Sequence, residues 1–482
     1  MTVDALRIQN FMAFEETDWL ELLPITLLFG RNSSGKSVLI RALLLLRQSL
    51  RATRDGQPFV FSDPYGVDLG GFREMVHRWR EESQVWFHFR CTSVEIEHLL
   101  ATSQNLEVRN LATPTLQISL GYAAYRDAQG QLDLSRIELT DLQIQSHDVD
   151  GEDGELLFKA ILLSQEDAGL FGDENWYVDG LLTQSNRPDT WKGFGCQIGR
   201  GFSDVRFTAP KNESDAAGYS EFRLLFQKLK QEIDGFLENI IHLGPIRPEP
   251  QRRYSFSRTA ANEWERHDWT AFRDFIGGKL DGRKRSEIND WLKNLDLAQN
   301  AEPRLSSENG ALFTEFEIAL QESTESRPVS LTAMGYGASQ VLPIIVQCIV
   351  ASPESLIIIE QPELHLHPAA QAALGDIFLT IALRKQPDPP AILLPSPPRF
   401  LLETHSEHLV LRMMRRMRNT TRKELPAGIP DTLSENIAVC VTTRNQEQHT
   451  SHTHRMEVSS EGQLLEPWPG GFFEEDFLER FS

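Results

Sequence analysis

The sequence has few of the residues that typify secreted or membrane-spanning proteins. Its 4 cysteines lie too far apart for a zinc motif or a disulfide framework, at Cys91, Cys196, Cys348 and Cys440. No apolar run approaches the ~20 residues that a membrane helix needs, because Leu43–Leu46 is short and Val341–Val350 contains Pro343 and Gln347. The first residues show no signal-peptide pattern. We therefore expect reduced thiols, a cytoplasmic location and no membrane association.

The sequence also has fewer basic than acidic residues. The 48 Lys and Arg residues face 69 Asp and Glu residues, which gives a formal net charge of −21. A chain this acidic repels nucleic acid at long range, so direct DNA binding would need a local basic patch or a partner. At 482 residues, of which 40% are hydrophobic, the chain is long enough for roughly two or three structural units with proper cores.

A phosphate-binding loop is the most specific local pattern. Residues Gly30–Ser37 read G-R-N-S-S-G-K-S and satisfy the full pattern G-x-x-x-x-G-K-[ST]. The loop follows the apolar run Ile25–Phe29 and opens the helical stretch Val38–Leu50, which is the strand–loop–helix context that the motif needs. Its N–H groups and the helix N-terminus would face phosphate oxygens, with Lys36 on the β- and γ-phosphates and Ser37 on Mg²⁺. The predicted nucleotide-binding residues are Gly30, Asn32, Ser33, Ser34, Gly35, Lys36 and Ser37.

An acidic strand end is the second motif. Leu356–Glu363 reads L-I-I-I-E-Q-P-E, and the three isoleucines indicate a buried strand that delivers Glu360 at its carboxyl end. A carboxylate there could organise the water shell of Mg²⁺ opposite Ser37. Buried strands that end in an acid are common, so the assignment depends on the flanking segments. These are the glycine-rich Leu331–Pro343 and the apolar Phe400–His408, which ends in polar residues.

The remaining pattern predicts a mixed α/β organisation. Residues from about 86 to 210 are strand-like, whereas Glu221–Ile241 and Glu263–Leu297 have helical periodicity. Neither helical stretch sustains heptads, so no long coiled coil is expected. Trp19–Phe29 and Leu312–Leu320 are predicted strands. The predicted domains are an N-terminal part with the phosphate loop and a β-rich lobe in residues 1–220, a helical insertion in 221–300, and a C-terminal part with the acidic strand end in 301–482.

Several motifs occur in a characteristic order along the chain. They are N-F-x-x-F at Asn10–Phe14, the phosphate loop, L-G-x-F at Leu69–Phe72, L-G-P-I-R at Leu243–Arg247, G-Y-G-A-S-Q at Gly335–Gln340, E-Q-P-E-L-H-L-H-P at Glu360–Pro368, E-T-H-S-E-H at Glu403–His408 and W-P-G-G-F-F at Trp468–Phe473. Jointly they resemble the ABC-type ATPase heads of the SMC, RecF and OLD nuclease proteins, most of all a compact bacterial subgroup found in anti-phage defence loci. The resemblance implies an α/β ABC-type head with a β-rich lobe and an inserted helical lobe. About residues 86–220 carry little of it.

The resemblance also implies an assembly of two or more chains. Gly335–Gln340 takes the place of the signature motif, which contacts the γ-phosphate held by a second subunit. The contacts so implied are Gly337, Ser339 and Gln340. His365 and His367 fall in the loop that crosses the dimer interface in such heads. We therefore expect a homodimer, or a larger even assembly, around two sandwiched ATP–Mg²⁺.

The catalytic residues implied by the resemblance include one departure. Glu360 is the metal-organising acid and His405 is the switch histidine that contacts the γ-phosphate, alongside Lys36. Most such heads place a glutamate after the metal acid to orient and deprotonate water, but here that position is Gln361. Glutamine cannot take a proton, and loss of a general base costs roughly 10²–10⁴ in rate. Either Glu363 substitutes or hydrolysis is slow, and we favour slow hydrolysis by a protein that acts as an ATP-dependent clamp.

Two groups of arginines leave alternatives open. A basic run follows the switch histidine, at Arg412, Arg415, Arg416, Arg418 and Arg422. Helical spacing places several of them near one face, which is either a solvated face or a contact for nucleic acid or an acidic partner. Arg247, Arg252 and Arg253 form a second cluster, which lies either near the nucleotide or interface or in solvent.

The predicted function depends on the resemblance more than on chemistry visible in the residues. It is that of an ATPase that regulates a separate effector, a nuclease or toxin, in bacterial anti-phage defence. Only 77 residues follow His405, too few for the Toprim nuclease domain of OLD nucleases. The alternative is a DNA-repair or recombination clamp of the RecF or SMC type.

Overall fold

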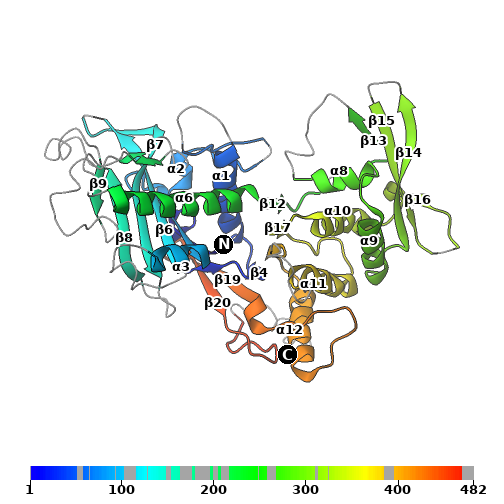
Figure 1. Cartoon of the computed structure of the whole chain (residues 1–482). Coiled ribbons are helices and arrows are strands. Elements are labelled where there is room, and N and C mark those ends of the chain that lie inside the picture. The colour runs from blue at the N-terminus through cyan, green and yellow to red at the C-terminus, as the bar shows by residue number, and fades with distance from the viewer. Residues whose placement is uncertain are drawn as a thin grey trace. The chain divides into compact units, whose positions relative to one another are not determined.

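The chain forms two compact units in the computed structural model (Figure 1). The first contains Met1–Glu21, Asn32–Glu238 and Thr443–Thr453, and the second contains Leu22–Arg31, Asn239–Thr442 and His454–Ser482. The structure describes residues 2–51, 58–64, 66–92, 94–102, 115–127, 129–147, 153–162, 176–179, 196–198, 205–207, 216–247, 249–257, 268–309, 313–323, 325–384 and 396–468. Within them, no helix has the length and apolarity to cross a membrane.

The first unit is built on an eight-stranded sheet in the order β2-β1-β5-β6-β7-β8-β9, with β3 paired to β1. The strands are β1 (Thr2–Phe11), β2 (Phe14–Glu16), β3 (Leu20–Glu21), β5 (Val85–Thr92), β6 (Thr115–Arg126), β7 (Leu132–His147), β8 (Asp153–Leu162) and β9 (Trp176–Asp179). A separate pair joins β10 (Cys196–Ile198) to β11 (Val205–Phe207). The helices are α1 (Lys36–Arg51), α2 (Phe72–Met75), the 3₁₀ turn η1 (His77–Trp79), α3 (Val94–Ala101) and α6 (Ala216–Glu238).

In this sheet, buried apolar residues occupy alternate positions along the strands and form a core face. In β5, Phe87, Phe89 and Cys91 are fully buried, and they lie opposite the apolar residues Leu120, Ile118 and Leu116 of β6. Alternate residues of a strand point to one face, so this face forms the core. Helix α1 carries L-L-L-L at 43–46, buried throughout, and packs against α6. The predicted β-rich character of about residues 86–210 is confirmed where the structure describes them.

A six-stranded sheet, most of which belongs to the second unit, has the order β12-β17-β18-β4-β19-β20. Its strands are β12 (Ile240–Leu243), β17 (Leu356–Glu360), β18 (Arg399–Glu403), β4 (Ile25–Gly30), β19 (Ile437–Asn445) and β20 (Thr450–Met456), the first five mutually parallel. The helices of the second unit are α8 (Thr270–Ile276), α9 (Gly282–Asn294), α10 (Tyr336–Val350), α11 (Pro368–Ala382) and α12 (Glu407–Arg422), with 3₁₀ turns η5 (Leu331–Ala333) and η6 (Ser434–Asn436). A smaller sheet contains β13 (Tyr254–Ser257), β14 (Asn300–Asn309), β15 (Phe313–Gln321) and β16 (Val329–Ser330).

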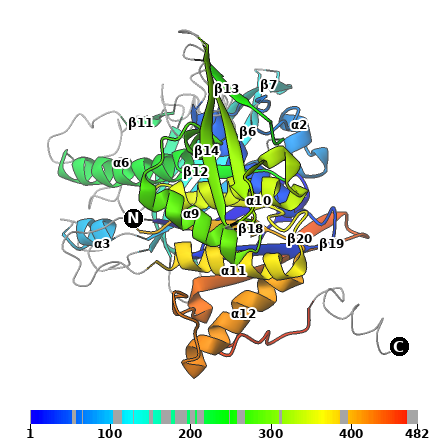
Figure 2. The same ribbon diagram turned by 90° about the vertical axis from the view of Figure 1, so that its right-hand side faces the viewer.

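The parallel strands align their carboxyl ends at one edge of this sheet. Leu356–Ile359 of β17 are fully buried, as expected for a strand covered on both faces. Glu360 pairs in register with Glu403 of β18, which in turn pairs with Leu28 of β4. Helices α11 and α12 pack against each other, as both ribbon views show (Figures 1 and 2). The end of β17 therefore lies at the same sheet edge as the end of β4, from which the phosphate loop departs.

The structure confirms several predicted elements and corrects one. The α/β class and the strand ending at Glu360 are confirmed, and the strand predicted over Leu312–Leu320 is β15, Phe313–Gln321. The single strand predicted over Trp19–Phe29 is wrong: Pro24, which has no N–H to donate, lies between β3 and β4. The longest helix in the described part is α6, with 23 residues, so no long coiled coil occurs there.

The three predicted domains do not correspond one to one with the two compact units, each of which is made of several segments of the chain. Helix α6 lies in the first unit, whereas α8 and α9 lie in the second. The boundaries at residues 220 and 300 stay a prediction. The motif that begins at Trp468 lies outside the described residues from position 469 onward.

Candidate functional site

The phosphate loop has the local backbone that its sequence predicts. Strand β4 ends at Gly30 and helix α1 begins at Lys36. Gly30, Ser33 and Gly35 have positive φ angles of 145°, 62° and 110°. A Cβ on Gly35 would lie 3.0 Å from Cζ of Phe14, so this position admits only glycine without a shift. The loop is thus a tight turn into a helix N-terminus, the backbone form that suits an anion.

The predicted nucleotide-binding side chains differ in exposure. Asn32 and Ser33 are exposed, whereas Ser34 and Lys36 are buried and Ser37 is half-buried. The buried Ser34 hydroxyl has no hydrogen-bond partner among the described residues. A buried hydroxyl without a partner costs free energy. An oxygen-rich ligand on this loop would offer it an acceptor.

Glu360 is held at both its side chain and its backbone. Its carboxylate Oε1 lies 2.7 Å from Nε2 of His242, a residue of the neighbouring strand β12. Its carbonyl accepts a 2.8 Å hydrogen bond from Nη2 of Arg247. The second carboxylate oxygen, Oε2, makes no hydrogen bond to the described residues. The Glu360 side chain is 17% exposed, and a partly exposed carboxylate suits a hard cation such as Mg²⁺, which binds proteins through one or two carboxylates and keeps several waters.

Arg247 acts as a buried clamp on the end of β17. Only 4% of this residue is exposed. Its guanidinium donates to the carbonyls of Pro245, Glu360 and Gln361 at 2.8, 2.8 and 3.2 Å. Burial lowers its pKa to about 10, against the opposing effect of the Glu363 and Glu360 carboxylates, so it stays charged at neutral pH. Of the arginine cluster predicted here, Arg247 therefore lies at the site, whereas Arg252 and Arg253 are exposed.

Gln361 lies in a strained turn directly after the acid. Its φ angle is +48°, a left-handed value that is uncommon for residues other than glycine. The turn is held by its N–H, which donates to the Glu403 carbonyl at 2.7 Å, and by its carbonyl, which accepts from Arg247. Such strain persists only where the surroundings fix it, and it is concentrated at functional sites.

Glu363 joins the loop after β17 to the loop after β18. Its Oε1 accepts from the backbone N–H of His405 and its Oε2 from the Thr404 hydroxyl, both at 2.7 Å. Only 8% of the residue is exposed, and burial raises the pKa of its carboxyl group, against the lowering effect of these hydrogen bonds. A general base needs a lone pair that reaches water. With both oxygens engaged and buried, Glu363 is placed to hold the His405 loop.

His405 itself lies between β18 and α12. Ser406 caps α12, because its Oγ accepts from the N–H of Leu409, and it also donates to Oε1 of Gln371 on α11 at 2.7 Å. Together with the hydrogen bond from Thr404 to Glu363, these bonds hold the residues on either side of the histidine. The structure thus brings three of the predicted catalytic residues, Glu360, Glu363 and His405, to the carboxyl ends of two adjacent parallel strands.

The signature-like segment forms the start of α10. Gly335 precedes the helix and Tyr336 is 54% exposed, with its ring edge-on to His365 at 4.9 Å. Ser339 is 2% exposed and donates its hydroxyl to the Tyr336 carbonyl at 2.8 Å. Gln340 is also buried. The exposed groups at this helix start are therefore Gly335 and Tyr336, while the roles of Gly337, Ser339 and Gln340 stay a prediction.

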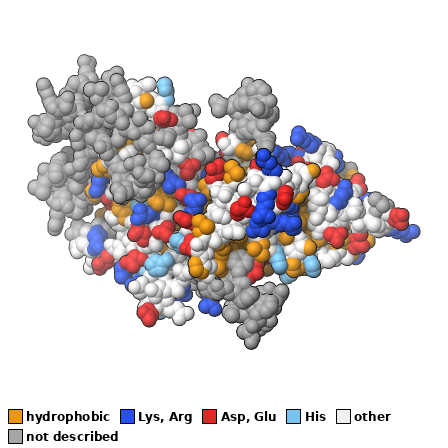
Figure 3. All heavy atoms as spheres, turned by 90° about the horizontal axis from the view of Figure 1, so that it is seen from below, with side chains coloured by type: hydrophobic (Ala, Val, Ile, Leu, Met, Phe, Trp, Pro, Cys, Tyr) orange, Lys and Arg blue, Asp and Glu red, His pale blue; other side chains and the backbone are white. Residues whose placement is uncertain are grey.

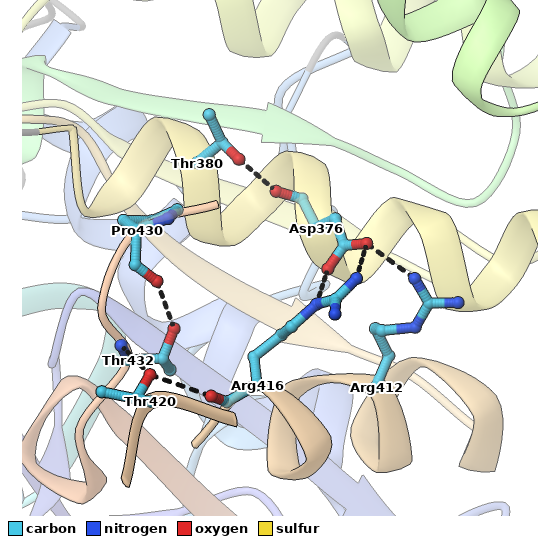
Figure 4. A network of polar contacts seen from close by, with 7 residues as sticks. All are labelled: Asp376, Thr380, Arg412, Arg416, Thr420, Pro430 and Thr432. Carbon is cyan, nitrogen blue, oxygen red and sulfur yellow. Dashed lines mark hydrogen bonds and ion pairs between the residues drawn. The ribbon is translucent and has the colours of Figure 1, made fainter. Parts of the chain in front are cut away.

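The basic run after His405 is mostly engaged within the chain. Arg416 makes two hydrogen bonds to Asp376 of α11, at 2.7 and 2.8 Å, and Arg412 makes a third at 2.6 Å (Figure 4). Arg422 pairs with Glu461 at 3.3 Å, and Arg418 donates to the carbonyl of the same residue.

These contacts correct part of the prediction. Arg412 and Arg416 do not form a solvated or ligand-binding face, because their i, i+4 spacing directs both toward Asp376. Arg415 is exposed. On the face shown in Figure 3, Lys and Arg side chains are interspersed with Asp and Glu.

Two site residues were missed by sequence reasoning, His242 and Thr404. His242 precedes the L-G-P-I-R motif within the short apolar strand I-I-H-L, and a polar residue in a buried strand was the available signal. Thr404 stands between the apolar β18 and His405. Among the described residues, no group of three or more His, Cys, Asp or Glu could hold a metal ion.

Comparison with known proteins adds a family-level likeness. Residues 210–411, fewer than half of the chain, match a family described as "AAA domain, putative AbiEii toxin, Type IV TA system". This region contains the signature-like segment, strand β17 with Glu360 at its end, and His405. A search of curated proteins finds no match.

Solved structures of SMC heads are also similar. The SMC head domain from Thermotoga maritima is 10% identical, with 95% of this chain and 100% of that chain covered and a TM-score of 0.38. An SMC head bound to the C-winged helix domain of ScpA is 11% identical, with 95% and 98% covered and a TM-score of 0.38. At these identities and scores the likeness is too loose to transfer residues or partners.

Proposed function

We propose that the protein is an ATP- and Mg²⁺-binding ATPase of the ABC type. The observation that carries this proposal is the complete phosphate loop, with positive φ at both its glycines, between β4 and α1. The support comes from Glu360, which ends a buried parallel strand of the sheet that also contains β4. Residues 210–411 independently resemble an AAA domain.

In this proposal, each residue of the site contacts either the phosphates or the cation, or holds a residue that does. The loop N–H groups and Lys36 bind the phosphates. Ser37 and Glu360 are the protein oxygens for Mg²⁺, which when bound would neutralise charge on the phosphates. His405, held by Glu363, is the polar group offered to the γ-phosphate. Phosphate and water supply the remaining oxygens that the cation needs.

The active assembly in this proposal is a homodimer or a larger even oligomer. The exposed start of α10 offers backbone N–H groups and the positive end of a helix dipole, which suit a phosphate held by another chain. His365 lies beside Tyr336, so the loop predicted to cross the interface and the signature-like segment form one surface. A single chain would then bind ATP and hydrolyse it poorly.

Slow hydrolysis is part of the proposal. Gln361 occupies the position that follows the metal acid, and both oxygens of Glu363 are engaged. The chain therefore supplies no evident carboxylate base at this turn among its described residues. ATP would close the assembly for long periods, and hydrolysis would relax it, which is a two-state element that can gate a partner.

The biological role that fits this element is regulation of a separate effector, a nuclease or toxin, in anti-phage defence. The family that residues 210–411 match is described as "putative AbiEii toxin, Type IV TA system", which connects domains of this kind with toxin systems. The alternative, a DNA-repair clamp, has less support because Arg412 and Arg416 are engaged by Asp376. Co-purification of a second protein with the chain from the native host would support the regulatory role. Co-purification of DNA without such a protein would support the clamp.

The nucleotide site is tested with Lys36→Ala on the full chain. Loss of a charged hydrogen-bond donor costs about 1.5–3 kcal/mol, so affinity for ATP–Mg²⁺ should fall roughly 10- to 100-fold. The matched control is Lys293→Ala, which removes an exposed lysine of α9 and should leave affinity unchanged. If Lys36→Ala binds ATP as tightly as the wild type, the proposed function is wrong.

A further inference from the structure

His242 contacts the acid that the proposed function assigns to the metal. Its Nε2 lies 2.7 Å from Oε1 of Glu360, and the two side chains are 22% and 17% exposed. The histidine is itself anchored, because its backbone N–H donates to Oδ2 of Asp268 at 3.0 Å. Its strand β12 runs parallel to β17, with His242 opposite Ile358, two positions before the acid.

In the hydrogen bond between His242 and Glu360, the imidazole is the donor and the carboxylate is the acceptor. An ionised carboxylate has no hydrogen to donate, so the hydrogen must come from the Nε2–H of the imidazole. Hydrogen bonds to ionised groups are short and strong compared with neutral ones. The bond therefore occupies Oε1 and restrains rotation of the carboxylate, while Oε2 makes no hydrogen bond to the described residues.

A second contact holds the same residue from its backbone. Nη2 of the buried Arg247 donates to the carbonyl of Glu360 at 2.8 Å. Backbone and carboxylate are thus fixed by separate side chains. Removal of the imidazole should release the carboxylate without moving the end of the strand.

We propose that His242 is a positioning residue for Glu360, which holds one carboxylate oxygen and leaves the other to the divalent cation. The inference depends on the proposed ATP–Mg²⁺ function and deepens it. Outer partners of metal-ligating groups typically change metal affinity by about 10- to 100-fold when removed. The effect should be specific to the cation, because His242 is assigned no contact with the nucleotide.

The test measures Mn²⁺ affinity of the full chain by electron paramagnetic resonance, in the presence of a non-hydrolysable ATP analogue. H242A should raise the Kd for Mn²⁺ about 10- to 100-fold. Analogue affinity in EDTA should stay unchanged. H242Q, whose amide can donate near the position of Nε2, should recover most of the affinity. H452A removes an exposed histidine of β20 and serves as the control.

A double-mutant cycle separates positioning from a general effect on the fold. If His242 acts through Glu360, H242A should cause almost no further loss of Mn²⁺ affinity in an E360Q background. Should H242A melt at a much lower temperature than the wild type, H242N takes its place, since asparagine is too short to reach Oε1.

The failures of the two proposals are distinguishable. Unchanged Mn²⁺ affinity in H242A, or a loss that simply adds to that of E360Q, overturns the role of His242 alone. If the wild-type chain binds neither the analogue nor Mn²⁺, the proposed function fails and the inference fails with it.

Discussion

The buried carboxylate of Glu363 accepts a 2.7 Å hydrogen bond from the backbone N–H of His405, 42 residues further along the chain. Its other oxygen accepts from the Thr404 hydroxyl, which in turn accepts from the N–H of Ser406. One side chain therefore fixes three successive residues of the loop between β18 and α12. This arrangement makes Glu363 a structural link between two loops of the site.

The Glu363→Gln variant should lower the stability of the fold more than it lowers the rate of ATP hydrolysis. The amide has one oxygen where the carboxylate has two, so one donor, from Thr404 or His405, loses its acceptor, at a cost of about 1–3 kcal/mol in the free energy of unfolding. Turnover should fall by less than roughly tenfold, short of the 10²-fold minimum for loss of a general base. Urea denaturation and a steady-state ATPase assay check this. A drop of 10² or more at unchanged stability would identify Glu363 as the base.

The Gln361→Glu variant should hydrolyse ATP faster. A carboxylate in the turn after Glu360 can accept a proton from water, which glutamine cannot, and general-base catalysis contributes roughly 10²–10⁴-fold. ATP affinity should stay unchanged, because no phosphate contact is assigned to this residue. Gln361→Asn, which leaves no base, is the matched control. Equal turnover of wild type and Gln361→Glu would show that this residue does not limit hydrolysis.

Gly337→Ala should destabilise the start of α10. A Cβ there would lie 2.9 Å from the carbonyl oxygen of His365, and backbone cannot move aside cheaply. Overpacking of this kind costs about 1–3 kcal/mol. At Gly335, two residues earlier, a Cβ meets nothing within 4 Å, so Gly335→Ala is the control. Thermal unfolding of the two variants should differ, and equal melting temperatures would contradict the packing described here.

Asp376→Ala should weaken the contact between α11 and α12. It would leave the buried Arg416 without its carboxylate, and removal of one partner of a buried ion pair costs about 3–5 kcal/mol. Arg415→Ala, on the same helix but exposed, should change the free energy of unfolding by no more than about 0.5 kcal/mol. Chemical denaturation measures both. A small loss for Asp376→Ala would mean that the two arginines find other acceptors.

His88 should make the chain less stable in acid. Burial in β5 lowers its pKa to about 3, whereas the unfolded chain has the ordinary value of 6.5. Between these values the unfolded state binds the extra proton, so stability present above pH 6.5 is lost as the pH falls, by at most about 1.4 kcal/mol per pH unit. His88→Asn should show a shallower loss over this window. Its control is His408→Gln, a change at an exposed histidine. Identical pH profiles for His88→Asn and wild type would contradict this assignment.

Local motifs were readable because their chemistry depends on contiguous residues. The loop from Gly30 to Ser37 needs its glycines wherever the rest of the chain lies, since the turn itself demands positive φ. The run Leu356–Glu360 is apolar because a parallel strand is covered on both faces. Trp19–Phe29 misled for a local reason, as Pro24 interrupts the strand.

Contacts between distant residues had no such signal. His242 and Glu360 are 118 positions apart, and Arg247 lies 113 positions from the carbonyl that it holds. Helical spacing placed Arg412 and Arg416 on one face, but only the packing of α11 against α12 showed that Asp376 lies opposite.

By itself, then, the sequence determined the phosphate loop, the acidic end of the strand Leu356–Glu360 and the residue types available at the sheet edge. The tertiary structure decided which of those residues are buried, paired or exposed. The physical reason is that a side chain's partners depend on which strands become neighbours, and strand order is set by packing of the whole sheet.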